Sequence, residues 1–178
     1  MRLFIAIELP EQARKALAGL RCDIPGARWV PWEQIHLTLA FLGEVDDDGV
    51  ARLTGRLSRI HAPAFTLRFG GSGCFPDRRR PRVLWVGLEH ESRLLHLAAK
   101  VHAAVTDSGM ALEDRPFSPH ITLARLKIPK PEEAGIFLDR HLQKKLPSLA
   151  VREFILFQSR LTQEGAIHTP IRSFPLAA

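Results

Sequence analysis

Cysteine is scarce in this chain, with only Cys22 and Cys74 among 178 residues. The two form no C-x-x-C pair and no cluster at the spacing of a zinc site. The sequence therefore predicts no structural metal and no disulfide framework, although a single disulfide between the two residues stays open. Two reduced thiols in a cytoplasmic protein are the expected arrangement.

Long apolar runs are also missing. The apolar stretch at residues 3–7 is followed by Glu8 and Pro10, and no small-residue cleavage site comes after it. This pattern disfavours a signal peptide and predicts a buried first strand. No segment approaches the roughly 20 apolar residues of a transmembrane helix. We therefore expect a protein that does not enter a membrane.

The remaining composition is typical of a globular domain, with 46% hydrophobic and 25% charged residues. We expect residues 1–178 to form a single domain without help from disulfides or metal. Lys and Arg outnumber Asp and Glu by 25 to 19, which gives a net charge of +6. Such a surplus favours a polyanionic partner such as RNA, because contacts to phosphates release counterions. By itself this is weak evidence.

Apolar periodicity predicts alternating helices and strands. Helices are expected over residues 11–20, 46–61, 92–108 and 132–145. Strands are expected over 2–8, 27–30, 35–42, 65–69, 82–88, 118–126, 152–161 and 167–176, with a turn at the glycines of 70–73. This order predicts an α+β fold with antiparallel sheets flanked by helices.

Two short segments share one pattern, HLTLA at residues 36–40 and HITLA at residues 120–124. Eight histidines and seven threonines in 178 residues give about 0.3 His-x-Thr triplets by chance, so a matched pair favours a functional site over two core histidines. The histidines lie 84 positions apart (120 − 36). This separation predicts a bilobed, pseudo-duplicated fold whose two lobes face a central cleft.

Strict strand alternation places each histidine beside its threonine on one face of the strand. The alanine that ends each segment would share that face and leave room for a ligand. Leu37, Leu39 and Phe41 would share the opposite, buried face.

Histidine titrates near neutrality, so one ring can act as a base while the other acts as an acid. In-line displacement at phosphorus needs that combination, because water must lose a proton and the departing ribose oxygen must gain one. Thr38 and Thr122 could donate to the non-bridging oxygens, where negative charge builds. A strained cyclic phosphate has a low intrinsic barrier, so we expect neither metal nor cofactor.

The chain resembles the bacterial RNA 2′,3′-cyclic phosphodiesterases, also called the 2′-5′ RNA ligase family, within the two-histidine phosphoesterase superfamily. The resemblance covers nearly the whole chain. The matching runs are residues 2–7, 32–43, 70–76, 81–87, 115–125 and 174–176. Of these, RPFSPHITLAR at residues 115–125 is the most specific.

The resemblance implies hydrolysis of 2′,3′-cyclic phosphates to 2′-phosphomonoesters, with RNA ends or cyclic nucleotides as substrates. From the cysteines and the absence of a signal peptide we expect a cytoplasmic enzyme, and we expect a monomer. His36 would be the proton donor and His120 the proton acceptor, although the symmetry of the motifs leaves the roles open. Arg125 would contact phosphate, but strict alternation puts it on the face opposite His120, so it would reach the cleft only if the strand bends or ends there. A salt bridge at the rim is the alternative. One departure is visible, since the chain has no tyrosine and carries His168 where relatives often have an aromatic residue.

Several other features allow two interpretations. The arginines at residues 78–80 and Arg82 form either an RNA-binding loop or a solvated one. Phe41 and Phe75 could stack a base, but core positions are the commoner outcome in such apolar surroundings. His96 and His102 are six residues apart on a predicted helix and do not share a face well, so metal binding is not expected.

Two other functions stay open on the sequence alone. One is 2′-5′ RNA ligation, which is the same chemistry in reverse with a ribose hydroxyl as nucleophile. The other is a noncatalytic nucleotide- or RNA-binding module, against which the two intact histidines argue.

Overall fold

The structure, a computed structural model, describes residues 1–140 and 146–178. The helices are α1 (Glu11–Ala18), α2 (Asp47–Leu57), α3 (Ser92–Asp107), α4 (Pro131–Asp139) and the 3₁₀ turn η1 (Trp32–Gln34). The strands are β1 (Arg2–Glu8), β2 (Ala27–Trp29), β3 (His36–Glu44), β4 (Phe65–Leu67), β5 (Phe69–Phe75), β6 (Val83–Leu88), β7 (His120–Leu126), β8 (Leu149–Val151), β9 (Glu153–Thr162) and β10 (Gly165–Pro175).

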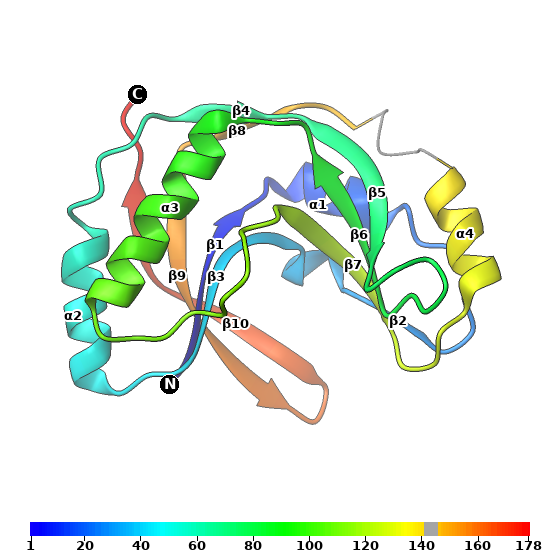
Figure 1. The fold of residues 1–178 in the computed structure, drawn as a ribbon, viewed down its shortest axis with the longest axis horizontal. Helices are drawn as coiled ribbons and strands as arrows, with labels where there is room; N and C mark the ends of the chain where they lie inside the picture. The colour runs from blue at the N-terminus through cyan, green and yellow to red at the C-terminus, as the bar shows by residue number, and fades with distance from the viewer. Residues whose placement is uncertain (141–145) are drawn as a thin grey trace.

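The strands form two four-stranded sheets and one small pair (Figure 1). Sheet A has the order β10-β9-β1-β3, and sheet B has the order β2-β7-β6-β5. All paired neighbours within them are antiparallel. Strand β3 of sheet A also contacts β7 of sheet B, so the two His-x-Thr segments lie on neighbouring strands. The predicted α+β fold with two repeated halves is confirmed.

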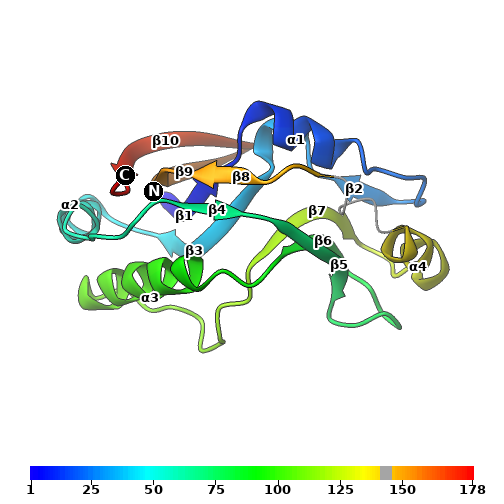
Figure 2. The ribbon, with the colours of Figure 1, turned by 90° about the horizontal axis from the view of Figure 1, so that it is seen from above.

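The helices begin within one residue of the predicted starts, but α2 ends at Leu57, before the predicted limit at residue 61. Asp46 caps α2, because its side chain accepts a hydrogen bond from the backbone N–H of Gly49 at 2.7 Å. Helix α3 packs against β3 and α2, and α1 lies on the opposite side of the strands from α3 (Figure 2). The predicted helix at 132–145 is α4 as far as Asp139, and residues 141–145 lie outside the described part of the chain.

A single buried cluster runs through both sheets. It includes Ile5 and Leu37 from sheet A together with Leu84 and Ile121 from sheet B, all at 0% exposure. We infer that the two sheets fold as one unit, because separating them would expose this shared apolar surface to water and lose the free energy that its burial contributes. The opposite face of sheet A carries a second, smaller cluster built around Phe4.

The glycine-rich segment at 70–73 is a strand and not the predicted turn. It lies within β5, where Gly73 pairs with Trp85 of β6. A Cβ atom on Gly73 would lie 2.2 Å from the indole of Trp85, so that ring occupies the space which a side chain would fill. Turn-forming composition was therefore overridden by cross-strand packing that needs glycine.

No helix in residues 1–140 or 146–178 is long and apolar enough to cross a membrane. Cys22 and Cys74 are free thiols and both are partly buried.

Candidate active site

A β-bulge in β3 decides which side chains accompany His36. Thr38 pairs with Ala6 and Ala40 pairs with Ile5, so Leu39 is an extra residue without a partner on β1. An extra residue reverses the alternation that follows it. The predicted faces are therefore wrong beyond Leu39, because Ala40 is buried and Phe41 is 68% exposed. Phe41 pairs with Phe4 and stands on the same face of the sheet as His36.

The same bulge occurs in β7. Thr122 pairs with Trp85 and Ala124 pairs with Leu84, which leaves Leu123 as the extra residue. Ala124 is buried, and Arg125 is exposed on the face that carries His120 and Thr122. Strict alternation, which would put Arg125 on the face opposite His120, therefore does not hold in β7.

Each bulge is held by a hydrogen bond to the carbonyl of its extra residue. The ring Nε2 of His102, on α3, lies 2.7 Å from the Leu39 carbonyl oxygen. The backbone N–H of Val30 donates to the Leu123 carbonyl at 2.8 Å. Because a buried unpaired carbonyl is costly, these contacts stabilise the bulges. The sequence offered no signal for the contact of His102, which depends on how α3 packs on β3.

The two motif histidines are held in the same way. The ring Nδ1 of His36 lies 2.6 Å from the Gln34 carbonyl oxygen, and Nδ1 of His120 lies 2.7 Å from the Ser118 carbonyl oxygen. A carbonyl can only accept, so each Nδ1 carries the proton that it donates. Each Nε2 atom is then left to exchange a proton with a ligand. The two halves thus present equivalent acid–base groups.

His36 sits in an aromatic environment. Phe4 stacks on its ring with centroids 4.9 Å apart, and His168 from β10 meets it edge-on at 5.4 Å. Burial, together with the charges of His168 and Arg125, lowers the pKa of His36 from 6.5 to about 4, and the hydrogen bond to Gln34 opposes this shift. Arg125 belongs to sheet B, so the two sheets bring their polar groups close together here.

His120 is flanked by two other aromatic residues. The Phe75 ring is almost perpendicular to the His120 ring with centroids 4.9 Å apart, and the Trp85 and His120 centroids are 6.0 Å apart. Trp85 lies over Gly73 and against Gly87, where a Cβ atom would also approach its ring closely. The glycines therefore let the indole lie flat on the sheet beside His120.

One family model, LigT like Phosphoesterase, matches residues 6–85 and again residues 86–168. The chain belongs to this family. Each half of the duplication contributes one His-x-Thr strand with its bulge, so the internal repeat of the family is visible in the site itself.

Relatives and solved structures agree with this assignment. The chain is 34% identical to the RNA 2′,3′-cyclic phosphodiesterase of Archaeoglobus fulgidus, over 98% of this chain and 99% of that protein. It is also 34% identical to the Escherichia coli protein of the same name, over 98% and 96%. The structure of E. coli LigT complexed with 3′-AMP superposes with a TM-score of 0.81 at 31% identity, covering 99% of this chain and 98% of that one.

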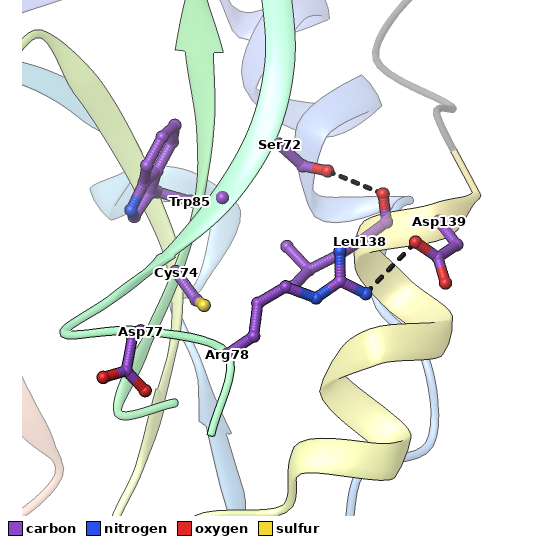
Figure 3. A pocket seen from close by; sticks show the side chains of 8 residues that line it. Ser72, Cys74, Asp77, Arg78, Trp85, Leu138 and Asp139 are labelled. Atoms are coloured by element: carbon purple, nitrogen blue, oxygen red, sulfur yellow. Dashed lines mark hydrogen bonds and ion pairs between the residues drawn. The ribbon is translucent and has the colours of Figure 1, made fainter. Parts of the chain in front are cut away.

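A pocket of about 420 Å³ lies between β5, the following loop and α4 (Figure 3). Ser72 donates to the Leu138 carbonyl at 3.2 Å, and Arg78 pairs with Asp139 at 3.2 Å. Burial raises the pKa of the Cys74 thiol, which also lines this pocket. Neither His36 nor His120 lines it.

The remaining histidines of the prediction do not gather at a site. His96 is exposed on α3, and His102 contacts Leu39 and the ring of Phe117. Within residues 1–140 and 146–178, no group of three His, Cys, Asp or Glu side chains is placed to hold a metal ion. In the sequence, His168 is only a difference from related proteins. In the structure its ring lies against that of His36.

Proposed function

We propose that this protein hydrolyses 2′,3′-cyclic phosphodiesters of RNA ends or nucleotides to 2′-phosphomonoesters, by metal-independent catalysis with His36 and His120. The observation that carries the proposal is the equivalent Nδ1–carbonyl bond of each ring, because it leaves two Nε2 atoms for acid–base chemistry. The relatives named RNA 2′,3′-cyclic phosphodiesterase supply the substrate class.

In this mechanism the neutral Nε2 of His120 accepts a proton from water as the water oxygen attacks phosphorus. The bond between phosphorus and the ribose O3′ breaks on the opposite side. The protonated Nε2 of His36 gives its proton to O3′, and the phosphate stays on O2′. His120 is then protonated and His36 neutral, so exchange with solvent restores both rings.

Other side chains on the same faces would stabilise the negative charge. Thr38 and Thr122 stand two residues after their histidines, on the same side of each strand. Their hydroxyls would donate to the non-bridging oxygens of the phosphate. The Arg125 guanidinium would add a positive charge, and the exposed ring of Phe41 would stack on the base.

The donor role of His36 imposes a condition. With a pKa of about 4, its ring is almost entirely neutral at pH 7 in the unliganded protein. A bound phosphodiester must therefore raise the pKa of His36 before this ring can act as an acid. The acid form would then exist mainly in the complex, where the leaving oxygen is present.

The purified protein should open 2′,3′-cyclic AMP in excess EDTA, and phosphorus NMR should identify adenosine 2′-phosphate as the product. His36→Ala and His120→Ala should each abolish turnover, whereas His96→Ala, on the exposed face of α3, should retain it. Activity that requires added metal, full turnover in either mutant of the pair, or a 3′-phosphate product would contradict the proposal.

A further inference from the structure

The loop of residues 76–82, between β5 and β6, starts beside His120. Phe75 is the last residue of β5, and its ring packs at a right angle against the His120 ring. The backbone N–H of Arg82 donates to the Phe75 carbonyl at 2.8 Å, which closes the base of the loop. Only the Phe75 ring therefore lies between the base of the loop and His120, the proposed proton acceptor.

Most charged groups of this loop already have partners. One carboxylate oxygen of Asp77 accepts the backbone N–H groups of Arg79 at 2.9 Å and Arg80 at 3.1 Å. Arg78 pairs with Asp139, and the Arg82 guanidinium donates to the Lys127 carbonyl. These contacts shape the loop and occupy two of its four guanidinium groups.

Arg79 and Arg80 are different. Both side chains are exposed, and neither forms an ion pair with any residue in the described part of the chain. Their backbones are held by Asp77, so two adjacent guanidinium groups project from an ordered turn. Paired arginines in such a position are suited to phosphate oxygens, with which guanidinium forms bidentate hydrogen bonds.

We propose that Arg79 and Arg80 bind the phosphate backbone of an RNA substrate on the 5′ side of its terminal nucleotide. This inference rests on the proposed function. A 2′,3′-cyclic phosphate can only end a strand, so the rest of an RNA substrate leaves the site from its 5′ side. The loop beside His120 provides positive charge for that departing strand, and a cyclic mononucleotide has no phosphate to reach it. The loop thus makes an oligonucleotide a better substrate than a mononucleotide.

The double variant Arg79→Gln/Arg80→Gln tests this with two substrates. One is 2′,3′-cyclic AMP, and the other is a short single-stranded oligoribonucleotide that ends in a 2′,3′-cyclic phosphate. Two phosphate contacts contribute about 1.4 to the slope of log affinity against log salt for a single strand. We therefore expect KM for the oligonucleotide to rise about tenfold near 0.15 M salt, with a salt slope smaller by about 1.4. Turnover of 2′,3′-cyclic AMP should stay unchanged.

Arg56→Gln/Arg59→Gln is the matched control. It removes the same charge from two exposed arginines of α2 and the residues after it, at the opposite end of the molecule from this loop (Figure 1). It should leave both substrates unaffected.

An equal rise in KM for the oligonucleotide in the control variant would show a general effect of net charge and overturn the inference. A loss of turnover of 2′,3′-cyclic AMP in Arg79→Gln/Arg80→Gln would overturn it as well, and so would an unchanged salt slope for the oligonucleotide in that variant. If the wild-type protein opens neither substrate, the proposed function fails instead.

Discussion

Anion binding should convert His36 from a neutral ring into an acid. Burial and nearby positive charge lower its pKa from 6.5 to about 4 in the unliganded protein. At an effective dielectric constant of about 20, a unit negative charge about 4 Å from the ring stabilises the imidazolium by about 4 kcal/mol. At 1.36 kcal/mol for each pKa unit, this raises the pKa of His36 to about 7.

Histidine ring NMR measures the change directly. The His36 signal can be assigned by its loss in His36→Gln, and its chemical shift followed from pH 3.5 to pH 8. Without ligand, the titration midpoint should lie near 4. With saturating sulfate, which carries two negative charges and no titrating proton in this range, it should move up to at least about 7. His96→Gln removes an exposed histidine of α3 and should leave the His36 titration curve unaltered.

Two results would refute this reasoning. A free-protein midpoint near 6.5 would mean that burial and the charge of Arg125 do not act on the ring as described. A midpoint that stays near 4 with bound sulfate would mean that the anion does not sit beside His36. The ring could not then serve as the proton donor near neutral pH.

Three further predictions follow from the same contacts. The pKa of His36 is lower in the folded chain than its ordinary value of 6.5, so the stability due to the neutral ring is complete above pH 6.5 and is lost as the pH falls toward 4. Acid unfolding of His36→Gln should therefore show a smaller loss of unfolding free energy over this window, by up to about 3 kcal/mol. Gly73→Ala should cost about 1–3 kcal/mol of unfolding free energy in denaturant melts, because its Cβ would displace the Trp85 ring. Gly71→Ala, where a Cβ meets nothing within 4 Å, is the control, and equal losses would exclude the packing explanation. Phe41→Ala should raise KM for 2′,3′-cyclic AMP about tenfold through lost base stacking. Because the ring is exposed, unfolding free energy should change by less than about 0.5 kcal/mol, and an unchanged KM would exclude the stacking role.

The sequence by itself determined the parts of the site that depend only on local order. A period of two puts His36 beside Thr38 and His120 beside Thr122 on any regular strand. The recurrence of the same five-residue pattern in both halves of the chain indicated the duplication, and residue runs indicated the family. Both indications were confirmed by the family model, which matches each half separately.

Only the tertiary structure decided which residues complete the site. Alternation holds until a strand gains a residue that its partner lacks, and that depends on pairing with another strand. Leu39 and Leu123 are such residues, so Phe41 and Arg125 stand on the faces opposite to those predicted. No local pattern marked either bulge, because the carbonyls of the extra residues are bonded by groups distant in the sequence. The glycines of β5 were likewise not predictable as a strand from the sequence, because their place in the strand depends on the indole of Trp85 that lies across them.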